Sequence, residues 1–378
     1  MILNENVERK IIPVAGGKGG VGKSVLAANL ALSMALFGKR TVLIDLDLGG
    51  SNLHTLLGMK NVNPGVGNFL SGRDYALADL AAPTEWENLR FIPGDVLVSG
   101  IGELTKSAKA RIVKGLLDID ADYIVVDLGG GANFTVVDFF LISNSGLIVT
   151  TPQSTAIMNA YSFLKNYVFR FLQRAFAQDK AVTAYLKQIL KERRPGAGAA
   201  VPEILSGITG VSAEAGEKAA AFLEVLQPKL LLNKIAGLDD VRIAQGLRDL
   251  CARNLSINLE CLGTVMTDGL VDRSIDERRP FILDNPEAVV SEEIHRIAQK
   301  IIQSGRFPEM PLELDYYADS FELAQIETEN DLSASRQTRE ESRDEDRYDI
   351  DKLLELVRIQ QTRIQELQST LKMLSINY

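Results

Sequence analysis

A glycine-rich stretch fixed between a strand and a helix limits the fold more than any other feature. The sequence GGKGGVGKS fills residues 16–24, directly after the apolar run Ile11–Ala15 and at the start of the helical stretch Ser24–Phe37. It fits the pattern of a P-loop, whose glycines let backbone N–H groups wrap phosphate oxygens at the positive end of a helix. A chance match in a glycine-rich turn is the alternative, and the flanking strand and helix argue against it. The stretch therefore predicts an α/β fold.

The chain keeps the same alternation up to about residue 305. Seven short runs rich in Val, Ile and Leu are strand candidates: Ile11–Ala15, Thr41–Asp45, Leu89–Ile92, Tyr123–Asp127, Gly146–Thr150, Lys229–Asn233 and Leu262–Val265. They alternate little between apolar and polar residues, as do strands that are covered on both faces. Helical stretches such as Lys106–Leu117 and Glu287–Gln303 lie between or after them. The pattern predicts a doubly wound, mostly parallel sheet.

The glycine-rich loop also supplies candidate phosphate and metal ligands. Lys23 is expected to reach the β and γ phosphates of a nucleotide, and the Ser24 hydroxyl to hold Mg²⁺. The predicted nucleotide-binding residues of the loop are Gly17, Lys18, Gly19, Gly20, Val21, Gly22, Lys23 and Ser24.

With KGGVGKS as its loop, the sequence resembles the deviant Walker A ATPases of the MinD/ParA family over roughly residues 10–305, apart from an insert. The resemblance implies ATP and Mg²⁺ as cofactors, hydrolysis of ATP to ADP and phosphate, and an ATP-dependent homodimer. It also implies that Lys18 crosses the dimer interface to the partner's nucleotide, by the same physics as an arginine finger. The other interpretation of Lys18 is a solvated loop charge.

Two aspartates follow the second strand candidate, in IDLDLGGSNLHTLLG (44–58). The resemblance implies that Asp47 positions the attacking water, that Asp45 lies near Mg²⁺ and this water, and that Asn52 supports the switch. The alternative for Asp45 is a cap at the end of a strand. The candidate catalytic residues are Lys18 and Asp47, and hydrolysis is expected to be slow and partner-stimulated because no strong base stands near the water.

Two later segments complete the resemblance. YIVVDLGGGAN (123–133) has the form of a Walker B strand, in which Asp127 would hold Mg²⁺ through water. Gly129 and Gly130 would let this second switch approach the γ-phosphate. Asn233 in LLLNKIAG matches the family's adenine-reading residue, whose amide both donates and accepts hydrogen bonds.

Within the family, DLDLGGSN and TTPQST look closest to the branch of MinD and the flagellar-number ATPase. This implies a dimerising switch that positions or regulates a cellular structure. The iron–sulfur branches need paired cysteines, which Cys251 and Cys261 do not supply near either switch. A DNA-partition ATPase of the ParA type is the alternative, although residues 1–310 hold 34 acids and 33 bases, whereas nonspecific DNA binding favours a basic face.

A helical insert, residues 163–228, is predicted to interrupt the P-loop ATPase domain formed by 1–162 and 229–310. Within residues 165–194 of the insert, aromatic residues interleave with eight bases, which are Lys165, Arg170, Arg174, Lys180, Lys187, Lys191, Arg193 and Arg194. One interpretation is a helix whose aromatic residues pack on the domain while the bases face water. The other is a docking surface for an acidic protein partner (the chain's own acidic segment among the candidates), for DNA or for anionic lipid.

Residues 311–349 hold 13 acids and four bases and are predicted to form a flexible linker. In 350–378, apolar residues recur at alternating spacings of three and four, with Gln360 in the one slot that is not apolar: Ile350, Leu353, Val357, Ile364, Leu367, Leu371 and Leu374. This is the seam of a coiled coil. A membrane-surface helix would instead crowd Lys and Arg on its polar face. The helix is expected to bind its own copy or a partner's helix, with packing on its own domain as the alternative.

The first residues lack the apolar stretch of a signal peptide, and the longest apolar run, Val25–Phe37, is too short to span a bilayer. Two cysteines ten residues apart fit a reducing compartment. The expected location is cytoplasmic, and at most peripheral at a membrane or pole through partners.

Overall fold

The computed structural model describes residues 10–48, 50–60, 64–72, 75–94, 104–192, 200–303, 321 and 324–335. By its contacts the chain divides into two compact units, Met1–Ile326 and Glu327–Tyr378. The first unit contains the sheet and the predicted insert.

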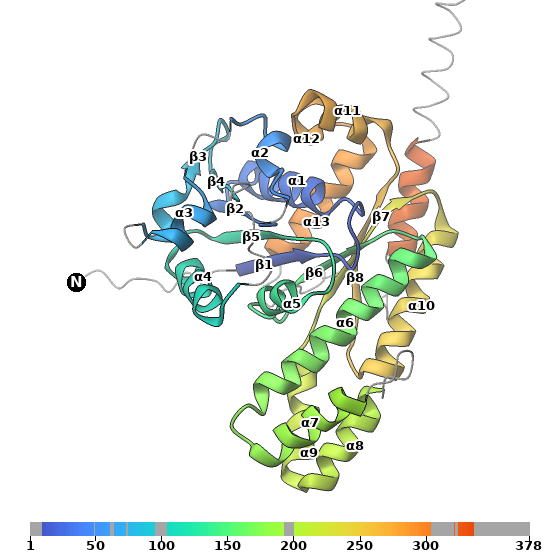
Figure 1. Ribbon diagram of the computed structural model, residues 1–378. Helices are drawn as coiled ribbons and strands as arrows, with labels where there is room; N and C mark the ends of the chain where they lie inside the picture. Colours follow the sequence, from blue (N-terminus) through green and yellow to red (C-terminus); the bar gives the residue numbers. More distant parts are fainter. Residues whose placement is uncertain are drawn as a thin grey trace, which may run out of the picture. The chain divides into compact units, whose positions relative to one another are not determined.

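Eight strands form one sheet in the order β3-β4-β2-β5-β1-β6-β7-β8 (Figure 1). The strands are β1 (Lys10–Ala15), β2 (Thr41–Leu46), β3 (Ala82–Pro83), β4 (Leu89–Ile92), β5 (Tyr123–Leu128), β6 (Leu147–Thr150), β7 (Lys229–Ile235) and β8 (Glu260–Met266). All neighbours are parallel except β3, which is antiparallel to β4. The predicted doubly wound, mostly parallel sheet is confirmed. The edge strand β3 was not predicted, because two residues leave no hydrophobic pattern.

Helices cover both faces of the sheet (Figure 1). They are α1 (Lys23–Leu36), α2 (Leu53–Leu56), α3 (Val66–Ser71), η1 (Leu77–Leu80), α4 (Lys106–Asp118), α5 (Phe134–Phe140), α6 (Ser154–Ala175), α7 (Lys180–Glu192), α8 (Val201–Val211), α9 (Ala213–Glu224), α10 (Leu238–Leu255), α11 (Gly269–Glu277), α12 (Phe281–Asp284) and α13 (Val289–Gln303). Helices α1 and α13 pack together on one face, while α4, α5, α6 and α10 lie on the other. Every residue of β2 and β5 is buried, as predicted for strands covered on both faces. No helix in the described ranges is both long and apolar enough to cross a membrane.

Helix α6 crosses the predicted boundary at residues 162/163 and runs beyond the sheet into a lobe formed with α7, α8 and α9 (Figure 1). Aromatic residues of this region pack inside the protein. The ring of Phe140 meets those of Phe163 and Tyr167 edge-on, each at a centroid distance of 5.1 Å, and Phe176 meets Phe222 at 5.8 Å. These rings therefore pack within the protein, as the packing interpretation expects.

Residues 324–335, within the segment predicted as a flexible linker, are helical instead. Buried positions recur every three or four residues, at Phe321, Ala324, Thr328 and Asp331, as on one face of a helix. The excess of acids hid this periodicity. The predicted coiled-coil segment 350–378 lies outside the described residues.

Candidate functional site

The glycine-rich loop joins β1 to α1 and leaves backbone N–H groups free to bind an anion. Gly20 and Gly22 have φ angles of 80° and 93°, which glycine adopts at little cost. Gly22 is also the N-cap of α1, and no side chain caps this helix. The first N–H groups of α1 therefore lack a side-chain acceptor, which is the arrangement that binds phosphate. Lys23 starts the helix and is only 7% exposed.

Backbone atoms of two other segments lie close to this loop. A Cβ atom on Gly17 would lie 2.1 Å from the carbonyl oxygen of Asn159 in α6. A Cβ atom on Gly130, in the loop after β5, would lie 3.4 Å from the backbone nitrogen of Gly19. Gly17 therefore needs to be glycine for space, whereas a Cβ atom at Gly130 would make ordinary van der Waals contact. The loop predicted to hold phosphate and the second predicted switch are therefore in close backbone approach.

Two buried aspartates stand side by side next to the loop. Asp45 of β2 and Asp127 of β5 are direct register partners, and their exposures are 0% and 1%. Burial, with the charge of Asp45, raises the pKa of Asp127 to about 8, while the Ser24 hydroxyl and Lys23 act in the opposite direction. The Oδ1 atom of Asp127 has no hydrogen-bond partner among the described residues. A buried carboxylate oxygen without a partner is costly unless a cation or water binds it.

These groups fit Mg²⁺. The unpartnered oxygen of Asp127 and the hydroxyl of Ser24 are hard oxygen donors of the kind that Mg²⁺ prefers. Within the described ranges no group of three or more His, Cys, Asp or Glu side chains could hold a metal ion by itself. Mg²⁺ typically takes one or two protein ligands and completes its shell with waters and substrate phosphates. The donor set thus suits an ion that arrives with a nucleotide.

Asp45 organises the loop that follows β2. Its Oδ2 atom accepts hydrogen bonds from the Ser51 hydroxyl at 2.7 Å and the Leu53 backbone nitrogen at 3.3 Å, and Oδ1 accepts from the Asp47 nitrogen at 2.9 Å. Burial raises its pKa to about 6 in spite of these bonds. These hydrogen bonds agree with the alternative prediction, in which Asp45 caps the end of a strand. A direct bond from Asp45 to a metal ion would compete with these hydrogen bonds. Asp45 is placed to fix the predicted first switch.

Asp47 faces the second predicted switch. A Cβ atom on Gly129 would lie 3.0 Å from Oδ1 of Asp47. The two switch loops, predicted from segments about 80 residues apart in the sequence, therefore meet at this carboxylate. A carboxylate in this place can accept a hydrogen bond from a water molecule.

A cavity of about 370 Å³ opens beside the loop, and both Asn52 and Asn233 line it. The apolar residues that line it were not predicted one by one and are Val25, Leu26, Leu56, Val265, Met266, Val271, Ile275 and Phe281. A cavity of this size and lining suits a flat aromatic base.

Asn233 also has a role that the sequence did not reveal. Its Nδ2 atom donates to the carbonyl of Val21 at 2.8 Å, and its Oδ1 accepts from the backbone nitrogen of Lys234 at 2.9 Å. The side chain thus braces the glycine-rich loop from β7. One amide hydrogen and one lone pair remain for an adenine edge.

Lys18 stands apart from the other predicted residues. It is exposed and forms no ion pair with any residue that the structure describes. Its charge is therefore available to a molecule outside the chain.

Residues 6–167 match the family model ParA, described as NUBPL iron-transfer P-loop NTPase. The antiactivator FleN of Pseudomonas aeruginosa is 33% identical over 160 residues, which are 41% of this chain and 55% of FleN. The flagellum site-determining protein YlxH of Helicobacter pylori is 36% identical over 161 residues, 41% of this chain and 53% of YlxH. The chain spans about half the length of these curated relatives.

Solved structures extend the likeness of the fold to most of the chain. The septum site-determining protein MinD of Pyrococcus horikoshii, complexed with Mg-ADP, covers 78% of this chain and 96% of its own, with a TM-score of 0.52 at 19% identity. The MinC:MinD complex of Aquifex aeolicus covers 80% of this chain and 98% of its own, with a TM-score of 0.51 at 19% identity. At this identity the likeness shows the fold alone. Residues 6–167 are thus similar in sequence to the ParA/MinD family of P-loop NTPases, and the fold of the chain is similar to that of MinD.

Proposed function

We propose that this protein is a Mg-ATP-dependent switch ATPase that dimerises and positions or regulates a cellular structure. One observation carries the proposal: Asp127, with an unpartnered buried oxygen, lies beside Ser24 of a phosphate-binding loop and beside the switch aspartates. This is the donor set for a nucleotide-bound Mg²⁺. The names of FleN, YlxH and MinD, an antiactivator and site-determining proteins, support the positioning role.

In the proposed reaction, Lys23 and the N–H groups at the start of α1 hold the β and γ phosphates. The metal supplies charge neutralisation on the phosphate oxygens when bound. Asp47 holds a water molecule in line with the γ-phosphate. Asp45 acts through the loop that it fixes, as a positioning residue. Because a carboxylate is a weak base, hydrolysis is slow, which suits a switch with a long-lived ATP state.

The dimer follows from Lys18. Its exposed ammonium group reaches the nucleotide of a second copy of this chain, so that ATP holds two protomers together.

We assign 1–162 and 229–310 to this ATPase domain and 163–228 to a helical insert. The 350–378 segment, and in part the insert, would bind a protein partner. The protein would act in the cytoplasm, at most peripherally at a membrane or pole.

Binding of a fluorescent ATP analogue, followed by phosphate release, tests the ATPase directly. Lys23→Ala should weaken binding at least about tenfold, because it removes a charge-assisted phosphate contact. Asp47→Ala should bind ATP like the parent and release little phosphate. Lys218→Ala, which removes an exposed lysine of α9 in the distant lobe, is the control and should match the parent. Parent-like phosphate release by Asp47→Ala would overturn the role of Asp47. A gel shift with nonspecific duplex DNA, with and without ATP, tests the alternative of a partition ATPase.

A further inference from the structure

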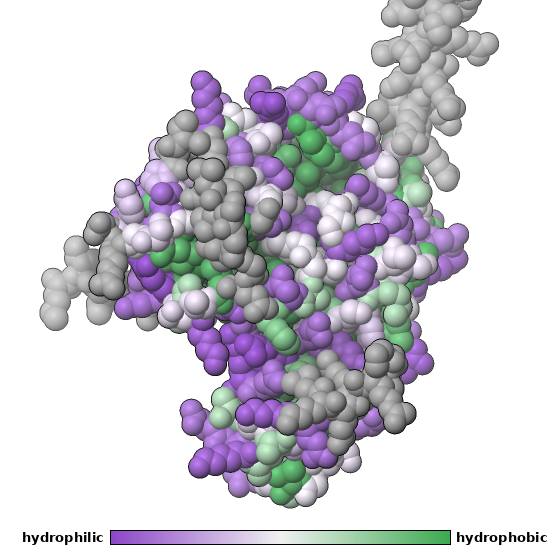
Figure 2. Space-filling view, in the orientation of Figure 1, coloured by the Kyte–Doolittle hydropathy of each residue, from purple (hydrophilic) through white to green (hydrophobic). Residues whose placement is uncertain are grey.

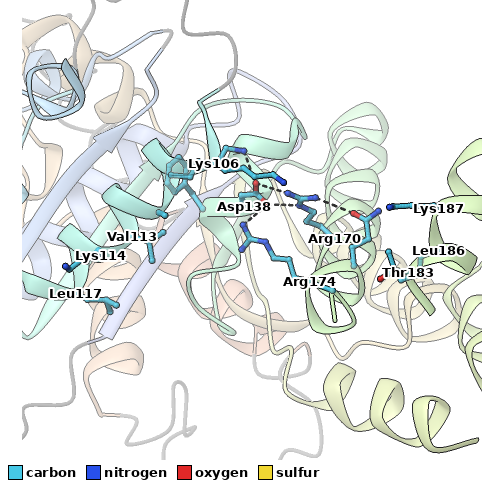
Figure 3. Close-up of a pocket in the computed structure, with 15 residues that line it drawn as sticks. Lys106, Val113, Lys114, Leu117, Asp138, Arg170, Arg174, Thr183, Leu186 and Lys187 are labelled. Atoms are coloured by element: carbon cyan, nitrogen blue, oxygen red, sulfur yellow. Dashed lines mark hydrogen bonds and ion pairs between the residues drawn. The ribbon is translucent and has the colours of Figure 1, made fainter. Parts of the chain in front are cut away.

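A second cavity, of about 790 Å³, is lined by residues of α4, α5, α6 and α7 and shares no lining residue with the base cavity. Helix α4 forms one wall, and α6 and α7 form the other (Figure 3). Figure 2 shows hydrophilic side chains gathered where α6 leaves the sheet toward the lobe of α7, α8 and α9. We call this cavity the α4–α7 groove.

The groove is strongly basic. Six of its lining side chains are bases: Lys106, Lys109, Lys114, Arg170, Arg174 and Lys187. Asp138 is its one acid. The Asp138 side chain is 3% exposed and contacts Lys109 at 2.8 Å, Arg170 at 2.7 Å and Arg174 at 3.0 Å. A single carboxylate held by three bases leaves the lining with an excess of five positive charges.

Three of these bases are free to act on a ligand. Lys106, Lys114 and Lys187 are exposed and form no ion pair with another residue in the described ranges. In Figure 3, Lys114 and Lys187 lie on opposite walls of the groove. A ligand with acidic groups on two sides can therefore pair with both walls at once.

The shape of the groove indicates the kind of ligand. Lining residues of α4 recur every three or four positions from Lys106 to Leu117, which is about three turns or roughly 16 Å of helix. Between the bases lie small and apolar side chains, including Ala110, Val113 and Leu117, and the Leu117 side chain is 54% exposed. A groove about three helical turns long that combines apolar side chains with charged ones can bind an amphipathic helix.

We propose that the α4–α7 groove binds an acidic amphipathic helix of a partner protein. Apolar side chains of that helix pack on Val113 and Leu117, and its carboxylates pair with Lys106, Lys114 and Lys187. The proposal does not depend on the ATPase activity.

The groove is also tied to the second switch. Asp138 is on α5, which begins directly after the loop that contains Gly129 and Gly130. Asn133 caps α5 by accepting a hydrogen bond from the Val136 nitrogen at 2.9 Å. Helices α4 and α6 are both joined to α5 by hydrogen bonds to Asp138, from Lys109 and Arg170 respectively. A helix bound in the groove would contact α4 and α6. Docking here thus acts on the element next to the nucleotide site.

The test uses the full chain and a fluorescein-labelled peptide of about 18 residues, roughly five helical turns, with leucines on one face and glutamates on the other. Fluorescence anisotropy should show saturable binding. The double variant Lys114→Glu/Lys187→Glu should weaken it about tenfold, because two exposed attractions become repulsions. Leu117→Ser should also weaken binding, and this loss should persist at high salt. Lys60→Glu, a reversal at an exposed lysine after α2, is the matched control and should bind like the parent.

A peptide of the same composition, scrambled so that the leucines share no face, separates a helix site from simple charge attraction. Weak binding of the scrambled peptide supports the proposal, and equal binding overturns it. Absence of binding by the amphipathic peptide also overturns it. So does a short DNA duplex that binds more tightly than the peptide and depends on the same lysines, because that result would mark a nucleic-acid site.

Discussion

Asp138→Asn is expected to destabilise the protein, because asparagine keeps the shape of the side chain and removes the charge that three bases share. The parent carboxylate accepts hydrogen bonds from Lys109 at 2.8 Å and from Arg170 at 2.7 and 3.1 Å. Arg174 adds a contact at 3.0 Å. In the variant, three positive charges would repel one another around a neutral amide.

The expected loss in the free energy of unfolding depends on how deeply Asp138 and its three basic partners are buried. A hydrogen bond to a charged group contributes about 1.5–3 kcal/mol, and removing one member of a buried ion pair costs about 3–5 kcal/mol. The Asp138 side chain is 3% exposed, but Lys109, Arg170 and Arg174 are 15%, 27% and 48% exposed, so the bases regain part of their hydration. We therefore expect a loss near the lower end, about 3 kcal/mol. Arg174→Gln, at the most exposed partner, should cost about 1 kcal/mol or less.

Urea unfolding at several pH values measures this loss and its origin. Burial alone would raise the pKa of Asp138, but hydrogen bonds from Arg170 and Lys109 and the charge of Arg174 outweigh it and hold the pKa below its ordinary value. A depressed carboxyl pKa stabilises the fold above the unfolded pKa, about 3.9, and this stability is lost as the pH falls through the folded pKa. The stability gap between the parent and Asp138→Asn should be constant from neutral pH to about 5 and shrink below about 4. A gap under about 1 kcal/mol at pH 7, or one that does not shrink in acid, would refute this reasoning.

Three further predictions concern residues at other places in the fold. Gly17→Ala should abolish binding of a fluorescent ATP analogue, because the new methyl group would lie 2.1 Å from the carbonyl oxygen of Asn159; parent-like affinity would contradict the close approach. Cys251 and Cys261 are buried, and burial raises the pKa of Cys251 to about 12, so a thiol reagent should label both only in denaturant. The double change Lys229→Met/Glu260→Met, which replaces both members of a buried ion pair by apolar side chains, should change the free energy of unfolding by less than about 1 kcal/mol, because such a pair costs about what it gains; a urea titration that shows a loss above about 3 kcal/mol would contradict this.

The sheet and the phosphate loop could be predicted because their signals are local. Each of the seven predicted strands is a short run rich in apolar residues, and the loop GGKGGVGKS is defined by residues within nine positions. The strand β3 could not be predicted, since Ala82 and Pro83 show no periodicity. Helix 324–335 was missed because its acidic composition masked a regular spacing of buried residues.

Contacts between distant segments could not be predicted. The amide of Asn233 and the carbonyl of Val21 are 212 positions apart, so the bracing of the loop appears only in three dimensions. In the sequence Arg170 and Arg174 look like solvated charges of a helix. The structure shows that they belong with Lys109 to one site around Asp138, a residue that no motif singles out. In the sequence, therefore, only an excess of basic residues indicates the α4–α7 groove beside Asp138.

The central claim is that the assembled loop and switches make an ATP-dependent dimer, and the mass of the Asp47→Ala chain in solution tests it most directly. Multi-angle light scattering should show a higher mass with Mg-ATP than with Mg-ADP. Adding Lys18→Ala should remove this increase while leaving ATP binding intact, because its exposed ammonium group is the charge assigned to the second copy. The control Lys218→Ala should keep the increase. Equal masses with ATP and ADP, or an undiminished increase in the Lys18→Ala chain, would contradict the account.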